Sequence, residues 1–363
     1  LTGIAAGTTR VSYTNGSGCL VMTVVTVNAR PGVITGTATV CEGASTTLAS
    51  ITSGGVWSSV TPSVATVVAG TGFVTGISAG TATVSVTNIA GCSQSTVVTV
   101  NPVPAGITGN APICIGNTLA LTSVTGGGSW FSSTPSVASV VSFTGLVSGV
   151  SAGTATITYR FATGCETRTV VTINPNPGPI TGTAAICVGG STTFTPPVSG
   201  GAWISGNTAV ATVTGAGVVS GVASGTANIS YTSIDGCIAV RVVTVNAIPG
   251  AIGGSLTVCS GSTTLLTNTS STGTWSNSNA TVGSINSITG LFLGITAGTT
   301  NVTFTSAAGC STVSVVTVQA LPAAITGFAS VCAGNTTTLS CTTTPGVWSS
   351  NNITVATIDP ATG

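Results

Sequence analysis

The alternation of apolar and small polar residues is the strongest signal in the sequence. From residue 81 to residue 87, Thr and Ser alternate with Ala82, Val84 and Val86. Successive side chains of a strand point to opposite faces, so the three apolar residues share one face and the hydroxyl residues share the other. This segment therefore predicts a half-buried β-strand. No segment of the sequence has the period of an amphipathic helix.

Short apolar runs on either side of this segment predict further strands. They lie at 46–51, 56–59, 64–68, 73–77 and 96–100, and glycine-rich turns such as 76–80 separate them. An Ile-x-Gly strand that leads into a Cys-x-Gly motif precedes them in the same unit. Seven short strands with turns every ~8–12 residues are typical of an all-β sandwich.

The same unit recurs along the whole chain. Its five tryptophans are spaced by 73, 73, 72 and 73 residues, and they are Trp57, Trp130, Trp203, Trp275 and Trp348. A fixed period indicates one structural unit repeated in tandem, with the tryptophan expected to anchor each core. The single missing residue falls where 213–217 replaces the longer turn 67–72. Loops tolerate a deletion better than strands do, so this position predicts a hairpin tip.

The period divides the chain into four whole repeats and two halves. We predict repeats at 31–103, 104–176, 177–248 and 249–321, with the C-terminal half of a repeat at 1–30 and the N-terminal half of a repeat at 322–363. Each of the five segments after residues 1–30 begins with a proline, which predicts short, stiff joints between the repeats. Residues 322–363 of one copy are expected to pack against 1–30 of the next, either within a longer repeat protein or between separate chains.

Residues 57–86 resemble a known domain. They read W-S-S-x-x-P-S-V-A-T-V…G-x-V-T-G-I-S-A-G-T-A-T-V and are similar to the group 2 bacterial immunoglobulin-like domain. The resemblance recurs at 130–159, 203–231 and 275–304. It implies a tandem array of seven-stranded immunoglobulin-like β-sandwiches and says little about activity, because this family supplies stalks and spacers of many surface proteins. Similar cysteine-containing repeats occur in very large exported proteins of Gram-negative gliding bacteria, which implies a filament or adhesin.

The cysteines follow the same period in two sets. The first set is Cys41, Cys114, Cys187, Cys259 and Cys332, and the second set is Cys19, Cys92, Cys165, Cys237 and Cys310. Cys341 belongs to neither set; it aligns with Ser50 and Ser123 and is expected to be unpaired. No repeat contains four metal ligands and the chain has no His, so a metal site is not expected. The two sets predict a disulfide framework in a secreted protein.

Spacing alone leaves the disulfide connectivity open. Pairing within a repeat is favoured because it would staple each small core, and it gives Cys41–Cys92, Cys114–Cys165, Cys187–Cys237 and Cys259–Cys310. Cys332 of one copy would then face Cys19 of the next. Pairing across a joint, as in Cys92–Cys114, is equally periodic. Bridges between neighbouring repeats or chains also remain, because the two sets fall at opposite ends of a seven-stranded sandwich.

The sequence gives no sign of catalysis. It lacks His and Lys, which are common general bases. The four carboxylates, Glu42, Glu166, Asp235 and Asp359, occupy four different positions of the repeat, so they form no recurring pair and no calcium loop. We expect no enzyme and no cofactor. We also expect no nucleic acid partner, since there is no basic patch, and no transmembrane segment, since polar residues interrupt every apolar run.

The low charge of the surface points to association. Only 2% of residues are charged, and outward strand positions are Thr, Ser and Asn instead of the Lys that commonly protects sheet edges. We predict a structural segment or subunit of an extracellular filament or cell-surface adhesin rod that continues or polymerises head-to-tail. The alternatives are a glycan-binding module with exposed tryptophans and a passive stalk for a tip domain. Glycans are also candidate modifications at sequons such as 15–17, 228–230 and 335–337.

Overall fold

The computed structural model describes residues 1–270 and 272–363, which form strands and turns and no helix. The predicted all-β class is therefore confirmed for the described residues. The chain separates into two compact units. The first contains residues 1–176 with 235–237, and the second contains residues 177–234 with 238–363.

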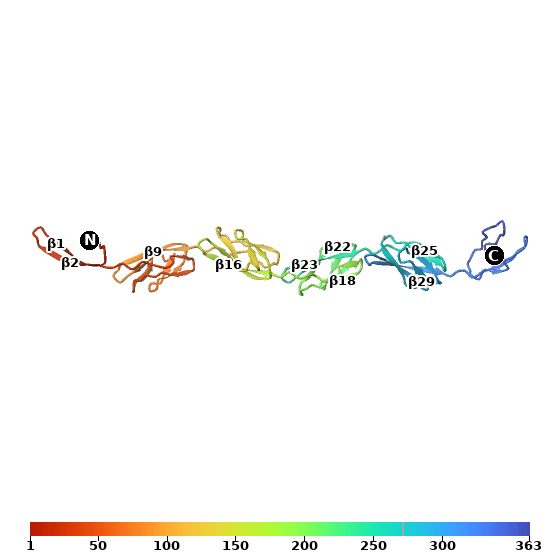
Figure 1. The fold of residues 1–363 in the computed structure, drawn as a ribbon, viewed down its shortest axis with the longest axis horizontal. Coiled ribbons are helices and arrows are strands. Elements are labelled where there is room, and N and C mark those ends of the chain that lie inside the picture. Colours follow the sequence, from red (N-terminus) through yellow and green to blue (C-terminus); the bar gives the residue numbers. More distant parts are fainter. Residues whose placement is uncertain (271) are drawn as a thin grey trace. The chain divides into compact units, whose positions relative to one another are not determined.

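Residues 39–101 form the first complete sandwich, drawn in orange in Figure 1. One sheet has the order β3-β9-β8-β5 and the other has the order β4-β7-β6. Every pair is antiparallel except β3 with β9, the first and last strands, which run parallel. This is an immunoglobulin-like arrangement. The strands are β3 Thr39–Cys41, β4 Ser45–Thr47, β5 Val56–Ser59, β6 Ala65–Val67, β7 Phe73–Gly76, β8 Gly80–Thr87 and β9 Ser93–Asn101.

The same pair of sheets recurs three more times, always as four strands and three. The second sandwich contains β10 Ile113–Cys114, β11 Thr118–Ala120, β12 Ser129–Ser132, β13 Ala138–Val140, β14 Leu146–Gly149, β15 Gly153–Arg160 and β16 Glu166–Asn174. The third contains β17 Ala185–Cys187, β18 Ser191–Thr193, β19 Ala202–Ser205, β20 Ala211–Val213, β21 Val218–Gly221, β22 Gly225–Thr232 and β23 Ile238–Asn246. The fourth contains β24 Thr257–Cys259, β25 Thr263–Leu265, β26 Gly273–Asn277, β27 Gly283–Ile285, β28 Leu291–Gly294, β29 Gly298–Ser306 and β30 Ser311–Gln319.

The cores form where the two-residue period places apolar side chains. Ala82, Val84 and Val86 of β8 are buried together, as predicted, and Val98 and Val100 of β9 lie in the same cluster. Full burial of a side chain as large as Val contributes roughly 1.5–3 kcal/mol to the free energy of folding. The position of Val86 holds Tyr159, Tyr231 and Phe304 in the other sandwiches, where the ring packs against the tryptophan of the same repeat.

A glycine beside each tryptophan closes the core. Gly72 has φ +72°, and a Cβ there would lie 2.3 Å from the carbonyl oxygen of Leu48 and 2.9 Å from the Trp57 ring. Only glycine fits both the backbone conformation and the space. Trp57, Trp130 and Trp275 are 5–7% exposed. Trp203 is partly buried and packs against the core of its own repeat. Trp348 is half-buried.

The hairpin turn accommodates the single deletion. Residues 68–72 connect β6 to β7, whereas 214–217 connect β20 to β21. The longer turn closes with Val68 N–H donating to the carbonyl oxygen of Phe73 at 2.9 Å, and the shorter one with Thr214 N–H donating to that of Val218 at 3.0 Å. The predicted location of the hairpin tip is confirmed.

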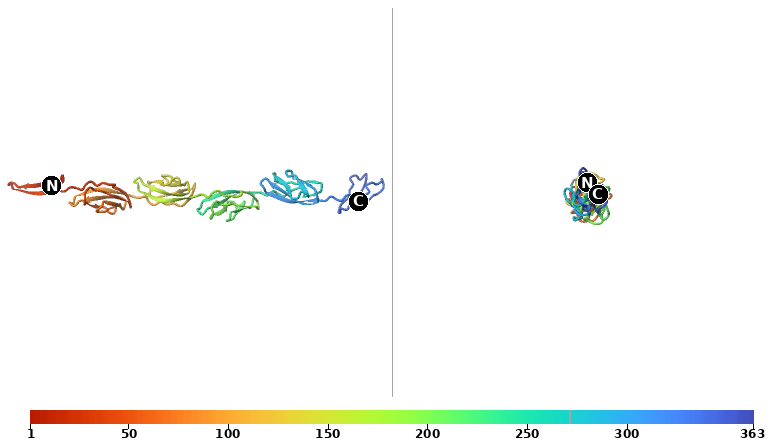
Figure 2. Two further views of the ribbon diagram at one scale, coloured as in Figure 1. Left: turned by 60° about the horizontal axis from the view of Figure 1, so that its bottom comes forward. Right: turned by 90° about the vertical axis from the view of Figure 1, so that its right-hand side faces the viewer.

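The two ends of the chain hold smaller sheets. β1 Gly7–Thr14 and β2 Leu20–Val27 form an antiparallel two-stranded sheet (Figure 2). β31 Thr326–Gly327 and β32 Leu339–Ser340 form the other two-stranded sheet. Most side chains of both segments are exposed. The residue limits that we assign to the repeats stay a prediction.

Candidate functional site

Three disulfides connect cysteines of different repeats. They are Cys41–Cys165, Cys114–Cys237 and Cys187–Cys310, with sequence separations of 124, 123 and 123 and a Cα–Cα distance of 5.7 Å in each. Each bond joins a first-set cysteine to the second-set cysteine of the following repeat. The pairing expected within repeats (Cys41–Cys92, Cys114–Cys165, Cys187–Cys237, Cys259–Cys310) is therefore wrong, and so is the pairing across a joint. Of the classes considered, a bridge between neighbouring repeats is the one observed.

The length of the last strand explains why pairing within a repeat fails. Cys41 is in register with Asn101, the last residue of β9, whereas Cys92 precedes Ser93, the first residue of that strand. Nine residues at ~3.3 Å each separate the two positions by about 30 Å. A disulfide requires Cα atoms within about 4.4–6.8 Å, so the two cysteines of one repeat cannot meet.

The first-set cysteine is held at the end of its own sandwich. β3 pairs parallel with β9, and Glu42 N–H donates a 3.0 Å hydrogen bond to the carbonyl oxygen of Asn101. Equivalent bonds run from Ile115 to Asn174, from Val188 to Asn246 and from Ser260 to Gln319. Each first-set cysteine therefore has a fixed position beside the carbonyl group that ends the repeat.

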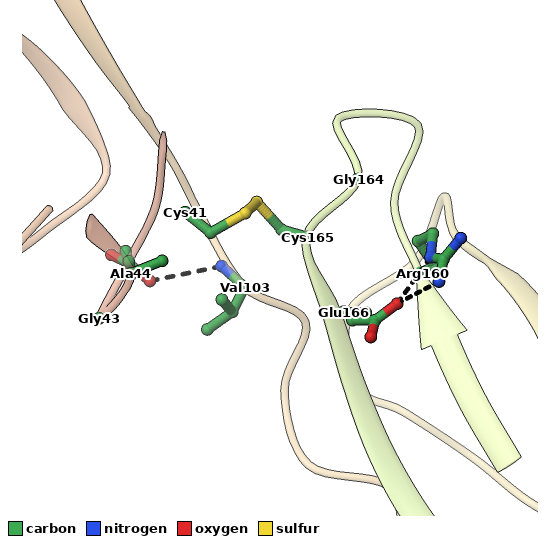
Figure 3. Close-up of a pocket in the computed structure, with 9 residues that line it drawn as sticks. Cys41, Gly43, Ala44, Val103, Arg160, Gly164, Cys165 and Glu166 are labelled. Atoms are coloured by element: carbon green, nitrogen blue, oxygen red, sulfur yellow. Dashed lines mark hydrogen bonds and ion pairs between the residues drawn. A yellow bond between two sulfur atoms is a disulfide. The ribbon is translucent and has the colours of Figure 1, made fainter. Parts of the chain in front are cut away.

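The second-set cysteine is presented by a tight turn of the next sandwich. Phe161 N–H donates to the carbonyl oxygen of Cys165, and Gly164 N–H donates to that of Phe161, both at 2.9 Å. The Cys165 sulfur then lies 3.9 Å from the carbonyl oxygen of Asn101. Figure 3 shows this turn reaching the disulfide with Cys41. Cys310 lies 3.8 Å from the carbonyl oxygen of Asn246 in the same way.

Charged groups surround the first of these disulfides. The Glu166 carboxylate accepts a hydrogen bond from Arg160 Nε at 2.6 Å (Figure 3). It accepts another from Arg168 Nε at 2.8 Å. Hydrogen bonds from Arg160 and then Arg168 hold the pKa of Glu166 below its ordinary value. The Glu42 carboxylate accepts the N–H of Ala79 at 2.7 Å and lies 3.5 Å from the N–H of Val103. Both carboxylates are thus used in fixing the segments that carry the disulfide.

Five cysteines of the described chain form no disulfide: Cys19, Cys92, Cys259, Cys332 and Cys341. Four of them belong to the two periodic sets. The expectation that Cys332 of one copy faces Cys19 of the next rested on pairing within repeats, which the three observed disulfides contradict. Cys341 instead occupies the position of a serine in other repeats and makes the same contact. Its thiol lies 3.3 Å from the carbonyl oxygen of Ala323, where Ser50 and Ser123 bond the equivalent carbonyls of Gly32 and Ala105.

Tryptophan burial bears on the glycan alternative. Trp57, Trp130 and Trp275 lie in the cores, so their rings offer no stacking platform for a sugar. Across the described residues, no group of three or more His, Cys, Asp or Glu side chains is arranged to hold a metal ion. None of the described residues forms a helix long and apolar enough to cross a membrane.

No protein-family model matches the chain, and no curated protein matches it. Similar solved structures include an S-layer protein, rSbsC(31-844), at 15% identity over 83% of this chain and 56% of that chain, with a TM-score of 0.21. Another is invasin, a bacterial integrin-binding protein, at 13% identity over 86% of this chain and 75% of that one, with a TM-score of 0.29. The human desmocollin-1 ectodomain has 12% identity over 87% and 86%, with a TM-score of 0.20. The chain spans little more than half of the S-layer structure, and similarities of this size carry no conclusion about function.

Proposed function

We propose that this chain is a structural segment of an extracellular surface protein, in which disulfides link each immunoglobulin-like repeat to the next and the linked array bears load. The observation that carries the proposal is the set of three disulfides between neighbouring repeats. Such bonds persist in oxidising compartments and are rare in the cytosol. The role requires no catalysis. The array continues or polymerises head-to-tail, as a filament or adhesin rod does.

The connectivity supports a load-bearing role. The closed loops 41–165, 114–237 and 187–310 overlap along the chain. A force applied between Cys41 and Cys310 passes through two disulfides and the segment 165–187, a span of 22 residues, as its shortest covalent path. The other residues between the two cysteines lie in closed loops beside that path. Unfolding a sandwich therefore lengthens the oxidised array very little.

The load path is already extended over much of its length. Within 165–187, β16 covers Glu166–Asn174 and β17 covers Ala185–Cys187. Strand residues rise about 3.3 Å each, close to the limit of about 3.3–3.6 Å for a stretched chain. Proline at 175 and 177 stiffens the connection between the two strands. These features support an array that resists stretching.

The same disulfides also stabilise the folded array. In the chain-entropy account, a loop of about 100 residues or more gives a disulfide that stabilises by roughly 4–5 kcal/mol. A domain of about 70 residues has only a marginal core of its own. Linking neighbours therefore strengthens units that would be weak individually, and it does so without charged side chains.

Localisation and bond state in the producing cell test the proposal together. Antibodies against the chain should label intact cells, and peptides from the native material should contain the three linked pairs found here. A matched digest prepared after reduction and alkylation serves as the control. Labelling only after permeabilisation, or cysteines that are reduced in the native material, would overturn the proposal.

A further inference from the structure

A hydrogen bond covers the edge of the larger sheet in the first, second and fourth sandwiches. In the first, the Trp57 N–H donates to the carbonyl oxygen of Ala69, in the turn after β6, at 2.9 Å. Trp130 and Trp275 make the same bond, also at 2.9 Å, with the residues at that position of their own turns. Each bond occupies an N–H of the outermost strand, which would otherwise be available to another chain.

The third sandwich lacks this bond. Its turn is one residue shorter, since 215–217 replace 69–72 between the hydrogen-bonded ends of the turn. Among the described residues, no carbonyl group accepts the Trp203 N–H. The Trp203 side chain is also less buried than the equivalent side chains of the other three sandwiches. The deletion therefore leaves β19 as an open edge strand.

Both polar backbone groups of Trp203 point out of this edge. Trp203 lies opposite Tyr231 of β22, in the register that Trp57 has with Val86, and the Trp57 N–H is directed away from β8. The N–H and C=O of one residue in an antiparallel strand point to the same side. Trp203 thus presents one donor and one acceptor, which an added antiparallel strand would satisfy.

The outer face of the sheet beside the open edge is apolar and uncharged. Ile204 is 65% exposed there. Three aliphatic side chains of β23 are 50–58% exposed on the same face, and they are Ile238, Val240 and Val242. Arg241 is the one charged residue of β17, β19, β22 and β23, and it lies on the opposite face, where its guanidinium donates to the carbonyl oxygens of Ile180 and Gly182.

We propose that β19 pairs with β19 of a second copy of this chain, antiparallel and about a two-fold axis at Trp203. The Trp203 N–H of each copy donates to the Trp203 carbonyl oxygen of the other, and the two four-stranded sheets become one. This lateral contact goes beyond the proposed function, which concerns bonds along a single chain.

A second copy is the occupant because the edge is complementary to itself. A two-fold pairing at one residue uses each free donor and each free acceptor once. It also places Ile204 beside Ala202 of the second copy on the outer face. The charged side chains that usually keep sheet edges apart are absent from β19, so no like charges meet.

The size of the contact sets its strength. β19 has four residues. A stable protein interface buries about 1,200–2,000 Å², far more than one such edge provides. The pairing is therefore weak between isolated chains, and it becomes effective where many chains are held side by side at high local concentration.

Engineered disulfides test the pairing and its register. In a full chain whose five cysteines without a disulfide are replaced by serine, one batch carries Ala202→Cys and another carries Ile204→Cys. The proposed register brings these two positions to a Cα–Cα distance of about 4.5 Å, within disulfide range. Identical positions lie about 7–8 Å apart on the diagonal. At high concentration in a glutathione redox buffer, the mixture should give at least about tenfold more linked dimer than either batch alone.

The first sandwich provides the matched control. Val56→Cys and Ser58→Cys occupy the same two positions of a covered edge, and mixing them should give no such excess. A second variant replaces residues 214–217 with the sequence of residues 68–72. This exchange restores the longer turn, so it should remove the excess from the Ala202→Cys and Ile204→Cys mixture.

Hydrogen exchange of the serine-replaced chain gives an independent readout. Exchange of the Trp203 amide should slow as the chain concentration rises, whereas exchange of the Trp57 amide should not change. Three outcomes would overturn the proposal: equal dimer yields from the mixture and the single batches, the same excess in the first sandwich, or Trp203 exchange that is independent of concentration. Peptide digests of the same samples report the three disulfides within the chain, so this inference can fail while the proposed function stands.

Discussion

At the residue scale, one position decides how each core is completed. It holds Val86, Tyr159, Tyr231 or Phe304, so aliphatic and aromatic side chains both fit there. The tyrosines add a hydroxyl that satisfies a backbone N–H and a backbone carbonyl at once. The hydroxyl therefore ties the turn before the tryptophan strand to the neighbouring strand of the same sheet.

Tyr231→Phe should weaken the third repeat. The substitution removes the partner of Gly201 N–H and of the Val198 carbonyl oxygen. Leaving such groups unsatisfied costs about 1–3 kcal/mol. Hydrogen exchange of the full chain should therefore show faster exchange within residues 177–248 and little change elsewhere. Tyr13→Phe is the control, because the Tyr13 side chain is exposed. If Tyr231→Phe changed hydrogen exchange no more than Tyr13→Phe does, the result would contradict the account.

Glu166 should make a small, pH-dependent contribution to stability. Its pKa is lowered from 4.5 by Arg160 and Arg168, so the folded state favours the charged carboxylate. The stabilisation is fully present above pH 4.5 and is lost as the pH falls through the lowered pKa. Because the arginines are largely solvated, Glu166→Gln should cost only about 0.2–1 kcal/mol at pH 7.

Urea unfolding followed from pH 7 to pH 2 measures this contribution. The free energies of unfolding of the wild type and of Glu166→Gln should converge at the acid end. A difference that grows as the pH falls would have the wrong sign for this ion-pair cluster.

At the element scale, glycine fixes the hairpin against the tryptophan. Gly72→Ala should destabilise the first repeat by at least about 1–2 kcal/mol, because φ +72° is left-handed and the new Cβ meets Leu48 and Trp57. Gly70→Ala is a matched control in the same turn, since a Cβ at Gly70 meets nothing within 4 Å. Thermal unfolding of both variants checks this, and equal melting of the two would refute the steric explanation.

Most strands could be predicted from local pattern, and the exceptions have structural causes. The predicted strand 56–59 coincides with β5, and 81–87 differs from β8 by one residue. The predicted strand 46–51 is shorter, because β4 ends at Thr47. Ala49 pairs instead with Thr35 of the opposite edge, and Leu48 turns into the core between them. This partner lies 14 residues earlier in the chain, and a local period cannot reveal which distant residue a strand will pair with.

At the scale of the whole molecule, the disulfides could be predicted as a framework but not as pairs. Period and spacing identify both sets of cysteines. Connectivity depends on which ends of the sandwiches meet, and that is decided by the parallel pairing of β3 with β9 and by the turn that carries Cys165. The placement of the two sets at opposite ends of a sandwich was the one signal that pointed beyond a single repeat.

Single-molecule stretching tests the central claim, that neighbouring repeats are linked in this pattern. The five cysteines without a disulfide in the described chain would be replaced by serine, and the chain would be pulled by its two ends. At about 3.5 Å per residue, the oxidised chain should reach a contour length of only about 400 Å, since most residues lie in closed loops. Reduced, it should reach about 1,250 Å. An oxidised length of about 910 Å, which the within-repeat pairs still possible in this variant (Cys114–Cys165 and Cys187–Cys237) would give, would contradict the account.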